Sequence, residues 1–263
     1  MRPRSAVPAR VAYGAGACRF GELSLPAGTG PVRGTVVVVH GGFWRSAYDL
    51  DLGRPLAADL VARGYAVWNI EYRRVGGLAE DAGGWTATFD DVAAAVDALA
   101  GPVAAAAPGR LDLDRVVAVG HSAGGQLVAW LAARPGLPPG VPGARPLVRL
   151  RGAVSQAGVL DLVDGAERGV GSGAITDLLG GDPGAVPDRY AVASPVARIP
   201  IGVPVVCVHG TADRNVPIRQ SERFAAASGS ELVRLAGVDH FAVIDPTTDA
   251  WRACRDAVER LLV

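Results

Sequence analysis

The sequence predicts an α/β fold built on a doubly wound, mostly parallel sheet, and three observations carry this prediction. Apolar runs of strand length alternate with segments of helical spacing along most of the chain. Two runs, 34–39 and 203–210, are rich in valine, as is typical of strands that are buried on both faces. With 263 residues, 49% of them hydrophobic, the chain can bury a full core as a single domain.

Each element follows from its local pattern. Apolar alternation or continuity predicts strands at 19–26 (at a sheet edge), 34–39, 65–72, 116–119, 147–154, 203–210 and 231–235. Helical spacing predicts helices at 52–63, ending before Gly64, and at 88–99, 126–133, 221–227 and 248–262. Proline and glycine predict a surface loop at 135–146 and a loosely held N-terminal segment at 1–15. Residues 163–198 lack a strong period and fit a small lid of short helices, including 174–179 and 188–191.

Charge and composition narrow the function classes. Basic and acidic residues number 26 each, so neither a nucleic-acid-binding surface nor a polybasic membrane patch is expected. No apolar run has the length of a transmembrane helix, and the arginine-rich N-terminus precedes no apolar signal segment. The 3 cysteines are far apart and odd in number, which predicts no disulfide framework. We therefore expect a cytoplasmic protein that acts on a small molecule, and its oligomeric state stays open, a homodimer included.

The segment around Ser122 carries the strongest functional signal. Four β-formers, 116–119, run into the sequence Gly-His-Ser-Ala-Gly at 120–124, and a helical segment follows. A Gly-x-Ser-x-Gly turn between a strand and a helix is typical of a nucleophile elbow, in which the serine is strained and its hydroxyl stands above the sheet. Side chains at Gly120 and Gly124 would collide with the neighbouring strand and helix. The alternative is a glycine-rich turn with an incidental serine.

A serine nucleophile needs a base, and the base needs an acid that orients it. Asp213 follows the strand predicted at 203–210, and His240 follows the strand predicted at 231–235. Both residues therefore emerge at the sheet edge where Ser122 stands, in the chain order serine, acid, histidine. Asp161 is a competing acid because it also follows a predicted strand. We favour a different role for it, in opening the lid segment or capping a short helix.

An acyl-transfer site also needs amide donors for the developing oxyanion. One is the N–H of Ala123, directly after the serine and at a helix N-terminus. The others are expected from the loop after the first valine-rich strand, where Gly41 and Gly42 allow the backbone to turn its amides inward. We assign Gly42 and Phe43 as donors, a choice that is open by one residue. Trp44 is expected to brace this loop by packing.

Three further histidines, His40, His121 and His209, end predicted strands at the same edge. They form no H-x-x-x-H pair and no cysteine pair lies near them in the sequence. We therefore expect them to tie loops together by hydrogen bonds, and we expect neither a metal nor another cofactor. Phe43 and Trp85 are candidates for lining an acyl or aryl pocket, with packing an equal alternative for Trp85.

These residues resemble the α/β-hydrolase superfamily, and within it the branch marked by the motif H-G-G-x-W, which is matched at 40–44. Further similarities to this branch lie at 13–14, 23–26, 71–74 and 120–125, so the resemblance covers nearly the whole chain. It implies an α/β-hydrolase fold with a small lid and a triad of Ser122, Asp213 and His240. It also implies that His40, Gly41 and Trp44 belong to the oxyanion motif. The branch includes kynurenine formamidases (arylformamidases) and small feruloyl- or acetyl-esterase-like enzymes, and both kinds share H-G-G-x-W.

Three hypotheses follow for the function. The first is a serine hydrolase that cleaves a small carboxylic ester or an aryl formamide through an acyl-enzyme. The second is a prolyl-peptidase-like serine peptidase, which would share the elbow and the triad order but for which we see no propeller or other gating domain. The third is a non-catalytic ligand-binding protein on the same fold. Such proteins usually lack the triad serine or histidine, and this chain keeps both.

Overall fold

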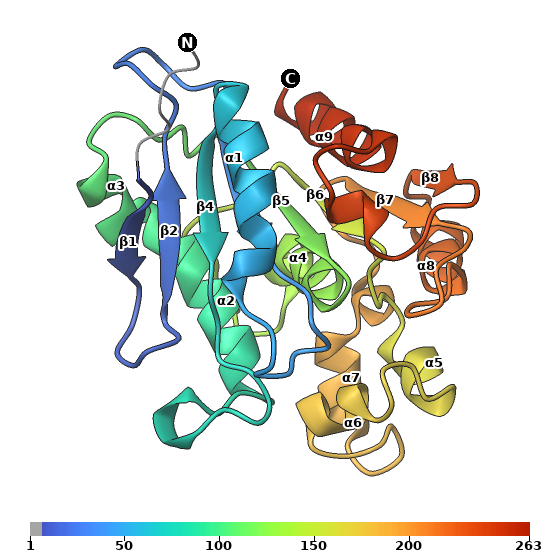
Figure 1. Cartoon of the computed structure of the whole chain (residues 1–263). Coiled ribbons are helices and arrows are strands. Elements are labelled where there is room, and N and C mark those ends of the chain that lie inside the picture. Colours follow the sequence, from blue (N-terminus) through green and yellow to red (C-terminus); the bar gives the residue numbers. More distant parts are fainter. Residues whose placement is uncertain (1–6) are drawn as a thin grey trace.

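The computed structural model describes residues 7–263, which form an α/β-hydrolase fold around one eight-stranded sheet (Figure 1). The strands are β1 (Ala9–Ala12), β2 (Phe20–Ser24), β3 (Thr35–Val39), β4 (Ala66–Ile70), β5 (Val116–His121), β6 (Gly152–Gln156), β7 (Val205–Gly210) and β8 (Leu232–Leu235). Their order across the sheet is β1-β2-β4-β3-β5-β6-β7-β8. All pairs from β4 to β8 are parallel, whereas β1–β2 and β2–β4 are antiparallel, so the predicted mostly parallel sheet is confirmed.

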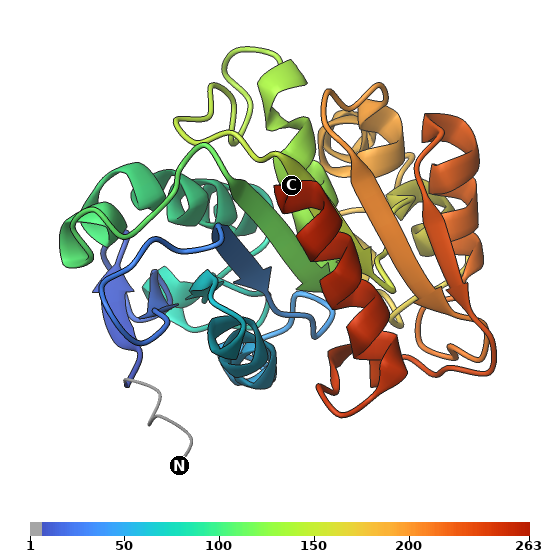
Figure 2. The same ribbon diagram turned by 90° about the horizontal axis from the view of Figure 1, so that it is seen from above.

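Helices cover both faces of the sheet. They are α1 (Arg54–Ala62), α2 (Ala87–Asp97), α3 (Pro102–Ala106), α4 (Ala123–Ala133), α5 (Leu162–Glu167), α6 (Ala174–Leu179), α7 (Pro187–Ala193), α8 (Arg219–Ser228) and α9 (Asp249–Leu262). Figure 2 shows α1 and α9 on one face and the other long helices on the opposite face, while α5, α6 and α7 gather at one end of the sheet in Figure 1. Within residues 7–263, none of the helices combines the length and apolar character that crossing a membrane requires.

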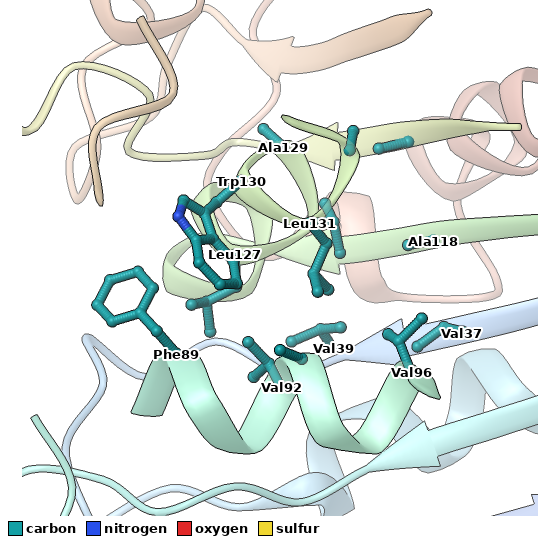
Figure 3. Packing of buried hydrophobic residues seen from close by; sticks show 14 of the residues in the cluster. Val37, Val39, Phe89, Val92, Val96, Ala118, Leu127, Ala129, Trp130 and Leu131 are labelled. Carbon is teal, nitrogen blue, oxygen red and sulfur yellow. The ribbon is translucent and has the colours of Figure 1, made fainter. Parts of the chain in front are cut away.

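The sheet separates two hydrophobic clusters. The larger one joins α2, α4 and the α5–α7 segment to one face of the sheet, and Figure 3 shows Phe89 and Val92 of α2 beside Leu127 and Trp130 of α4. The smaller one packs α1 and α9 against the other face. Every residue of β3, β5 and β7 is buried, because these strands are covered on both faces. This packing fixes the strand ends from which the polar residues of the site project.

The helix boundaries have local causes. α9 begins after Thr248, whose hydroxyl accepts the amide N–H of Trp251 at 3.1 Å, and this N-cap matches the predicted start. α1 is preceded by a short 3₁₀ turn, η1 (Leu50–Gly53), and ends before Gly64, where φ is 93°. α6 spans the residues predicted for it, 174–179. The other short helices of this segment are α5 and α7. The bounds of α5 were not predicted, but Asp161 caps it, one of the two roles expected for that residue, and α7 is longer than predicted.

The N-terminal part of the prediction was wrong. The predicted loose segment 1–15 contains β1, although residues 1–6 of it lie outside the described residues. Because β1 pairs with β2, the predicted edge strand 19–26 is an inner strand, and β1 is the edge. Three of the four β1 residues are exposed, so side-chain alternation gave no signal there. The pairing comes from the backbone and from Arg10, whose guanidinium lies 3.6 Å from the Phe20 ring centroid.

Two further elements begin three or more residues later or earlier than predicted. β6 begins at Gly152, not at residue 147, because the amides of Leu147 and Val148 donate to Asp97 Oδ1 of α2 at 3.0 and 3.2 Å and not to a strand. α4 begins at Ala123, not at residue 126, so two glycines lie in its first turn. Glycine lowers helix propensity, and here it is required by close packing that the local sequence does not show.

Candidate active site

Ser122 occupies a sharp turn between β5 and α4. Its φ is positive, 55°, with ψ −116°, a conformation that costs a non-glycine residue energy and persists only when its surroundings enforce it. A Cβ on Gly120 would lie 2.3 Å from the carbonyl oxygen of Gly124, and one on Gly124 would lie 2.1 Å from that of Val39. The amide of Ser122 donates to the carbonyl of Gln156 on β6 at 2.8 Å. The turn is therefore held from both neighbouring strands.

Asp213 and His240 are brought together by β7 and β8, which end side by side. His240 Nδ1 donates to Asp213 Oδ2 at 2.6 Å, and both side chains are almost fully buried. Asp213 Oδ1 accepts the amides of Asn215 and Val216 at 2.8 and 2.9 Å. Since Nδ1 carries the proton, Nε2 of a neutral His240 ring is left as a proton acceptor.

The pKa of Asp213 is lowered well below that of an ordinary aspartate. Burial by itself would raise this pKa, but hydrogen bonds from His209 and His240 outweigh it. Asp213 is therefore a permanent anion beside His240 at neutral pH.

Ser122 and His240 line one small cavity of about 70 Å³. Most of its remaining wall is apolar or aromatic, and its full lining is Gly42, Phe43, Tyr48, Leu52, His121, Ser122, Asn215, His240, Phe241 and Ile244. Larger surface cavities of about 460 and 410 Å³ exist, but none of the three polar residues Ser122, Asp213 and His240 lines either. The small cavity is therefore the candidate active site, because it joins a strained serine to an oriented histidine.

The loop after β3 passes beside the serine. Gly42, Phe43 and Trp44 have φ values of 109°, 51° and 55°, so three successive residues are left-handed. The Trp44 indole N–H, fully buried, donates to Gln126 Oε1 of α4 at 3.1 Å and holds this conformation. A Cβ on Gly41 would lie 3.1 Å from Ser122 Cβ, which measures how closely the loop approaches.

Three amides around Ser122 have no acceptor. Among the hydrogen bonds of residues 7–263, the backbone N–H groups of Gly42, Phe43 and Ala123 donate to no protein atom. Ala123 is fully buried and opens α4, where the helix dipole favours negative charge. A buried donor without a partner, such as Ala123, is rare and needs an explanation, and the half-buried Gly42 and Phe43 lie on the wall of the small cavity.

His40 anchors the base of this loop. Its Nε2 lies 3.0 Å from Glu71 Oε1, and its ring stacks on Tyr72 with 4.3 Å between centroids. The Tyr72 hydroxyl donates to the His40 carbonyl oxygen at 2.9 Å, and Arg74 forms an ion pair with Glu71. His40 is thus held inside a buried polar cluster and does not line the small cavity.

His121 ties the serine strand to the histidine loop. Its Nε2 donates to the carbonyl oxygen of His240 at 2.8 Å, and the two rings lie 4.5 Å apart. Burial, together with the positive charge that His240 can carry, lowers the pKa of His121 to about 3. His121 is therefore neutral across the physiological range.

The remaining predicted residues lie away from the cavity. Asp161 is the N-cap of α5: its Oδ1 accepts the amide of Asp164 at 3.0 Å, and its Oδ2 accepts a hydrogen bond from Arg223 at 2.8 Å. Trp85 packs edge-on against Phe89 with ring centroids 5.3 Å apart and does not line the cavity.

Sequence reasoning missed several residues of the site. Tyr48 and Ile244 line the cavity from turns that the local patterns did not indicate, and Leu52, predicted as the start of a helix, lines it from the 3₁₀ turn η1. Asn215 and Phe241 had a signal, since each lies within two residues of Asp213 or His240. His209 was expected to tie loops together, but its contact with Asp213, at 3.2 Å between Nε2 and Oδ2, was not anticipated. No group of three or more His, Cys, Asp or Glu side chains in the described chain is arranged as a metal site.

The BD-FAE family model matches residues 22–227, which include the serine turn, Asp213 and the loop after β3. The chain belongs to the BD-FAE family. Solved structures similar to this BD-FAE family member include esterases. A thermophilic esterase from Thermogutta terrifontis, Est2, is 26% identical with a TM-score of 0.74, over 99% of this chain and 93% of that one.

Two more solved structures extend the comparison. The butyrate-bound form of the same Est2 is 25% identical with a TM-score of 0.74, over 99% of this chain and 95% of that one. A truncated carbohydrate esterase from gut microbiota is 19% identical with a TM-score of 0.77, over 99% and 98% of the two chains, a similarity that shows the fold. A comparison with curated proteins finds no match.

Proposed function

We propose that this BD-FAE family member is a serine hydrolase that cleaves small carboxylic esters through an acyl-enzyme. Ser122 is the nucleophile, His240 the general base and Asp213 the acid that orients it. The observation that carries the proposal is the 2.6 Å hydrogen bond from His240 Nδ1 to a buried aspartate, next to a cavity that His240 shares with a strained serine.

The chemistry follows from this arrangement. His240 Nε2 takes the proton of the Ser122 hydroxyl as its oxygen attacks the ester carbonyl carbon. The carbonyl oxygen becomes an oxyanion, to which the unpaired amides of Gly42, Phe43 and Ala123 can donate. The intermediate collapses with cleavage of the bond to the alcohol, which leaves with the proton from His240. Water then attacks the acyl-enzyme by the same route, which releases the acid and restores the Ser122 hydroxyl.

The cavity supports short, uncharged acyl groups. Its volume of about 70 Å³ leaves room for only a few non-hydrogen atoms, and its wall carries no Lys, Arg, Asp or Glu. The neighbour Est2 has been solved with butyrate bound, an acid of this size. We also propose that the α5–α7 segment acts as a lid, because Arg45, next to the loop after β3, donates to the Ser172 carbonyl at 3.0 Å and pairs with Asp177.

An aryl formamide is the second candidate substrate. The formyl group is the smallest acyl group, so it fits the same cavity. Tyr48 and Phe241, 48% and 57% exposed, line this cavity with aromatic rings that could stack on an aryl amine leaving group. The resemblance to kynurenine formamidases points to the same chemistry.

The decisive experiment combines labelling and turnover. We expect a fluorophosphonate probe to label Ser122, Ser122→Ala to lose both labelling and turnover, and the exposed control Ser46→Ala to keep both. p-Nitrophenyl esters of graded acyl length, assayed beside N-formylkynurenine, then rank the substrates. Absence of labelling would favour a non-catalytic ligand-binding protein, and labelling with turnover of peptides alone would favour a peptidase.

A further inference from the structure

We propose that His209, fixed by Ser221, is a positioning residue that holds the Asp213 carboxylate in the orientation that His240 requires. The inference rests on the proposed function, since it assigns a role relative to the base of that site. It adds a second histidine and a serine behind the triad.

The contacts of His209 fix its tautomer. His209 is the penultimate residue of β7, four residues before Asp213, and its side chain is fully buried. Its Nε2 lies 3.0 Å from the carbonyl oxygen of Val216 and 3.2 Å from Asp213 Oδ2. Both partners are acceptors, so Nε2 carries the proton. In the neutral ring Nδ1 is then an acceptor, and the Ser221 hydroxyl of α8 lies 2.8 Å away as its donor.

His209 completes the set of hydrogen-bond donors around the Asp213 carboxylate. Oδ1 receives the amides of Asn215 and Val216, and Oδ2 receives His240 Nδ1 and His209 Nε2. Val216 therefore donates to one oxygen of Asp213 and accepts from the histidine bound to the other. A carboxylate held by four donors has no freedom to rotate. Without His209, Oδ2 would keep His240 as its one donor. The plane of the Asp213 carboxylate would then be fixed only by the two amides that donate to Oδ1.

The shared oxygen has an electrostatic consequence. Donation from His209 withdraws negative charge from Oδ2, the atom that stabilises a protonated His240. The ionisable groups that contact His240 are Asp213 and His121, and His209 contacts Asp213 in turn. His121 contacts the backbone oxygen of His240, so it competes for neither carboxylate oxygen. Loss of the His209 donor should therefore favour protonated His240 and move the activity profile to higher pH.

A role in packing alone makes a different prediction. If His209 only fills space under the site, any residue of similar volume should lower stability without changing the pH profile. His209→Leu preserves approximate volume and removes the donor. His209→Gln keeps an N–H that can reach the same oxygen, and Ser221→Ala leaves the imidazole in place but removes the group that fixes its tautomer.

The experiment measures kcat, KM and thermal stability of the three variants on a p-nitrophenyl ester of a short acid, through the histidine titration range. We expect His209→Leu to lower kcat by about 10²-fold with little change in KM, because a slightly misplaced base is enough for such a loss. The rising limb of the plot of kcat against pH should move to higher pH. His209→Gln should restore most of kcat and the wild-type limb, and Ser221→Ala should lie between.

The downfield proton resonance of His240 Nδ1–H gives an independent readout that needs no turnover. We expect it to shift in His209→Leu and Ser221→Ala and to hold its position in His209→Gln. If His209→Leu does not fold, the other two variants carry the same comparison. The proposal would be overturned by a folded His209→Leu or Ser221→Ala variant that keeps the wild-type kcat, pH profile and His240 Nδ1–H resonance. It would also be overturned if His209→Gln and His209→Leu were equally impaired and the rising limb of the pH profile did not move. A wild-type enzyme without fluorophosphonate labelling at Ser122 would instead remove the proposed function.

Discussion

His121 donates from Nε2 to the backbone carbonyl oxygen of His240 at 2.8 Å, so the strand that carries Ser122 also holds the loop that carries the proposed base. The bond requires a protonated Nε2, and burial keeps the ring neutral, with a pKa lowered to about 3. The placement of Ser122 relative to His240, the proposed nucleophile and base, therefore depends on His121. In the proposed mechanism His121 neither attacks the substrate nor accepts the proton of Ser122.

The first prediction concerns acid stability. An unfolded histidine takes up a proton below about pH 6.5, whereas His121 in the folded protein stays neutral down to about pH 3. The unfolded state binds more protons between these two pH values. The contribution of His121 to the stability of the folded protein is therefore complete above this range and is lost as the pH falls through it. We expect a loss of about 1.4 kcal/mol per pH unit from this group. The lowered pKa of Asp213 acts in the same direction at lower pH.

Urea unfolding at a series of acidic pH values measures this effect. The matched variant His121→Gln keeps an amide donor for the His240 carbonyl and does not titrate. It should lose stability less steeply than wild type as the pH falls. Parallel curves for the two proteins would show that His121 does not contribute the acid sensitivity.

The second prediction separates the two candidate acids. Asp213→Asn should lower kcat on the order of 10⁴-fold: its oxygen would accept the two backbone amides, so its NH2 group would face His240 Nδ1 and hold the ring in the wrong tautomer. Asp161→Asn is the matched control, since asparagine still caps α5 and only the ion pair with Arg223 is lost. Arg223 is 45% exposed, so this loss should cost no more than about 1 kcal/mol of stability. A larger drop in kcat for Asp161→Asn than for Asp213→Asn would reassign the acid.

The elements that the sequence predicts best are those whose own side chains determine them. β3, β5 and β7 are buried on both faces, and their valine-rich runs record that environment directly. The positions of Asp213 and His240 after neighbouring strands then place both at one edge, and in the structure they are hydrogen-bonded.

What the sequence could not indicate depends on partners far away in the chain. β1 exists through its pairing with β2, and the start of β6 depends on Asp97 of α2. The cavity wall combines Tyr48 and Leu52 with Ile244, nearly two hundred residues later. The contact of His209 with Asp213 needs the loop after β7 to fold back, and no local periodicity records that turn.

The third prediction tests the amides of the loop after β3. A Cβ on Gly42 would lie 2.4 Å from Tyr48 Cβ, and its φ of 109° is unfavourable for alanine. Gly42→Ala should therefore rotate the amides of this loop and lower kcat by about 10²–10³-fold, the size of losing one oxyanion donor. Gly30→Ala is the control, because no atom lies within 4 Å of its added Cβ. A Gly42→Ala enzyme that is folded, by its melting temperature, and retains wild-type kcat would remove these donors from the mechanism.

The last prediction concerns the length of the acyl group. Leu52, His121 and Ile244 line both the site cavity and a second cavity of about 10 Å³ behind it, whose wall includes Val38 and Leu56. Ile244→Ala should join the two spaces and admit longer chains. Each methylene that is newly buried is worth about 0.8 kcal/mol, or roughly fourfold in kcat/KM.

Graded p-nitrophenyl esters measure this change as the ratio of kcat/KM for a long acyl chain to that for acetate. The ratio should rise in Ile244→Ala and stay at the wild-type value in Leu78→Ala, a control at a residue that is 86% exposed and outside the cavity. Truncation of half-buried Ile244 should also lower stability, so the assays belong below the melting temperature of the variant. An unchanged chain-length profile in a folded Ile244→Ala would mean that the acyl group does not occupy this cavity.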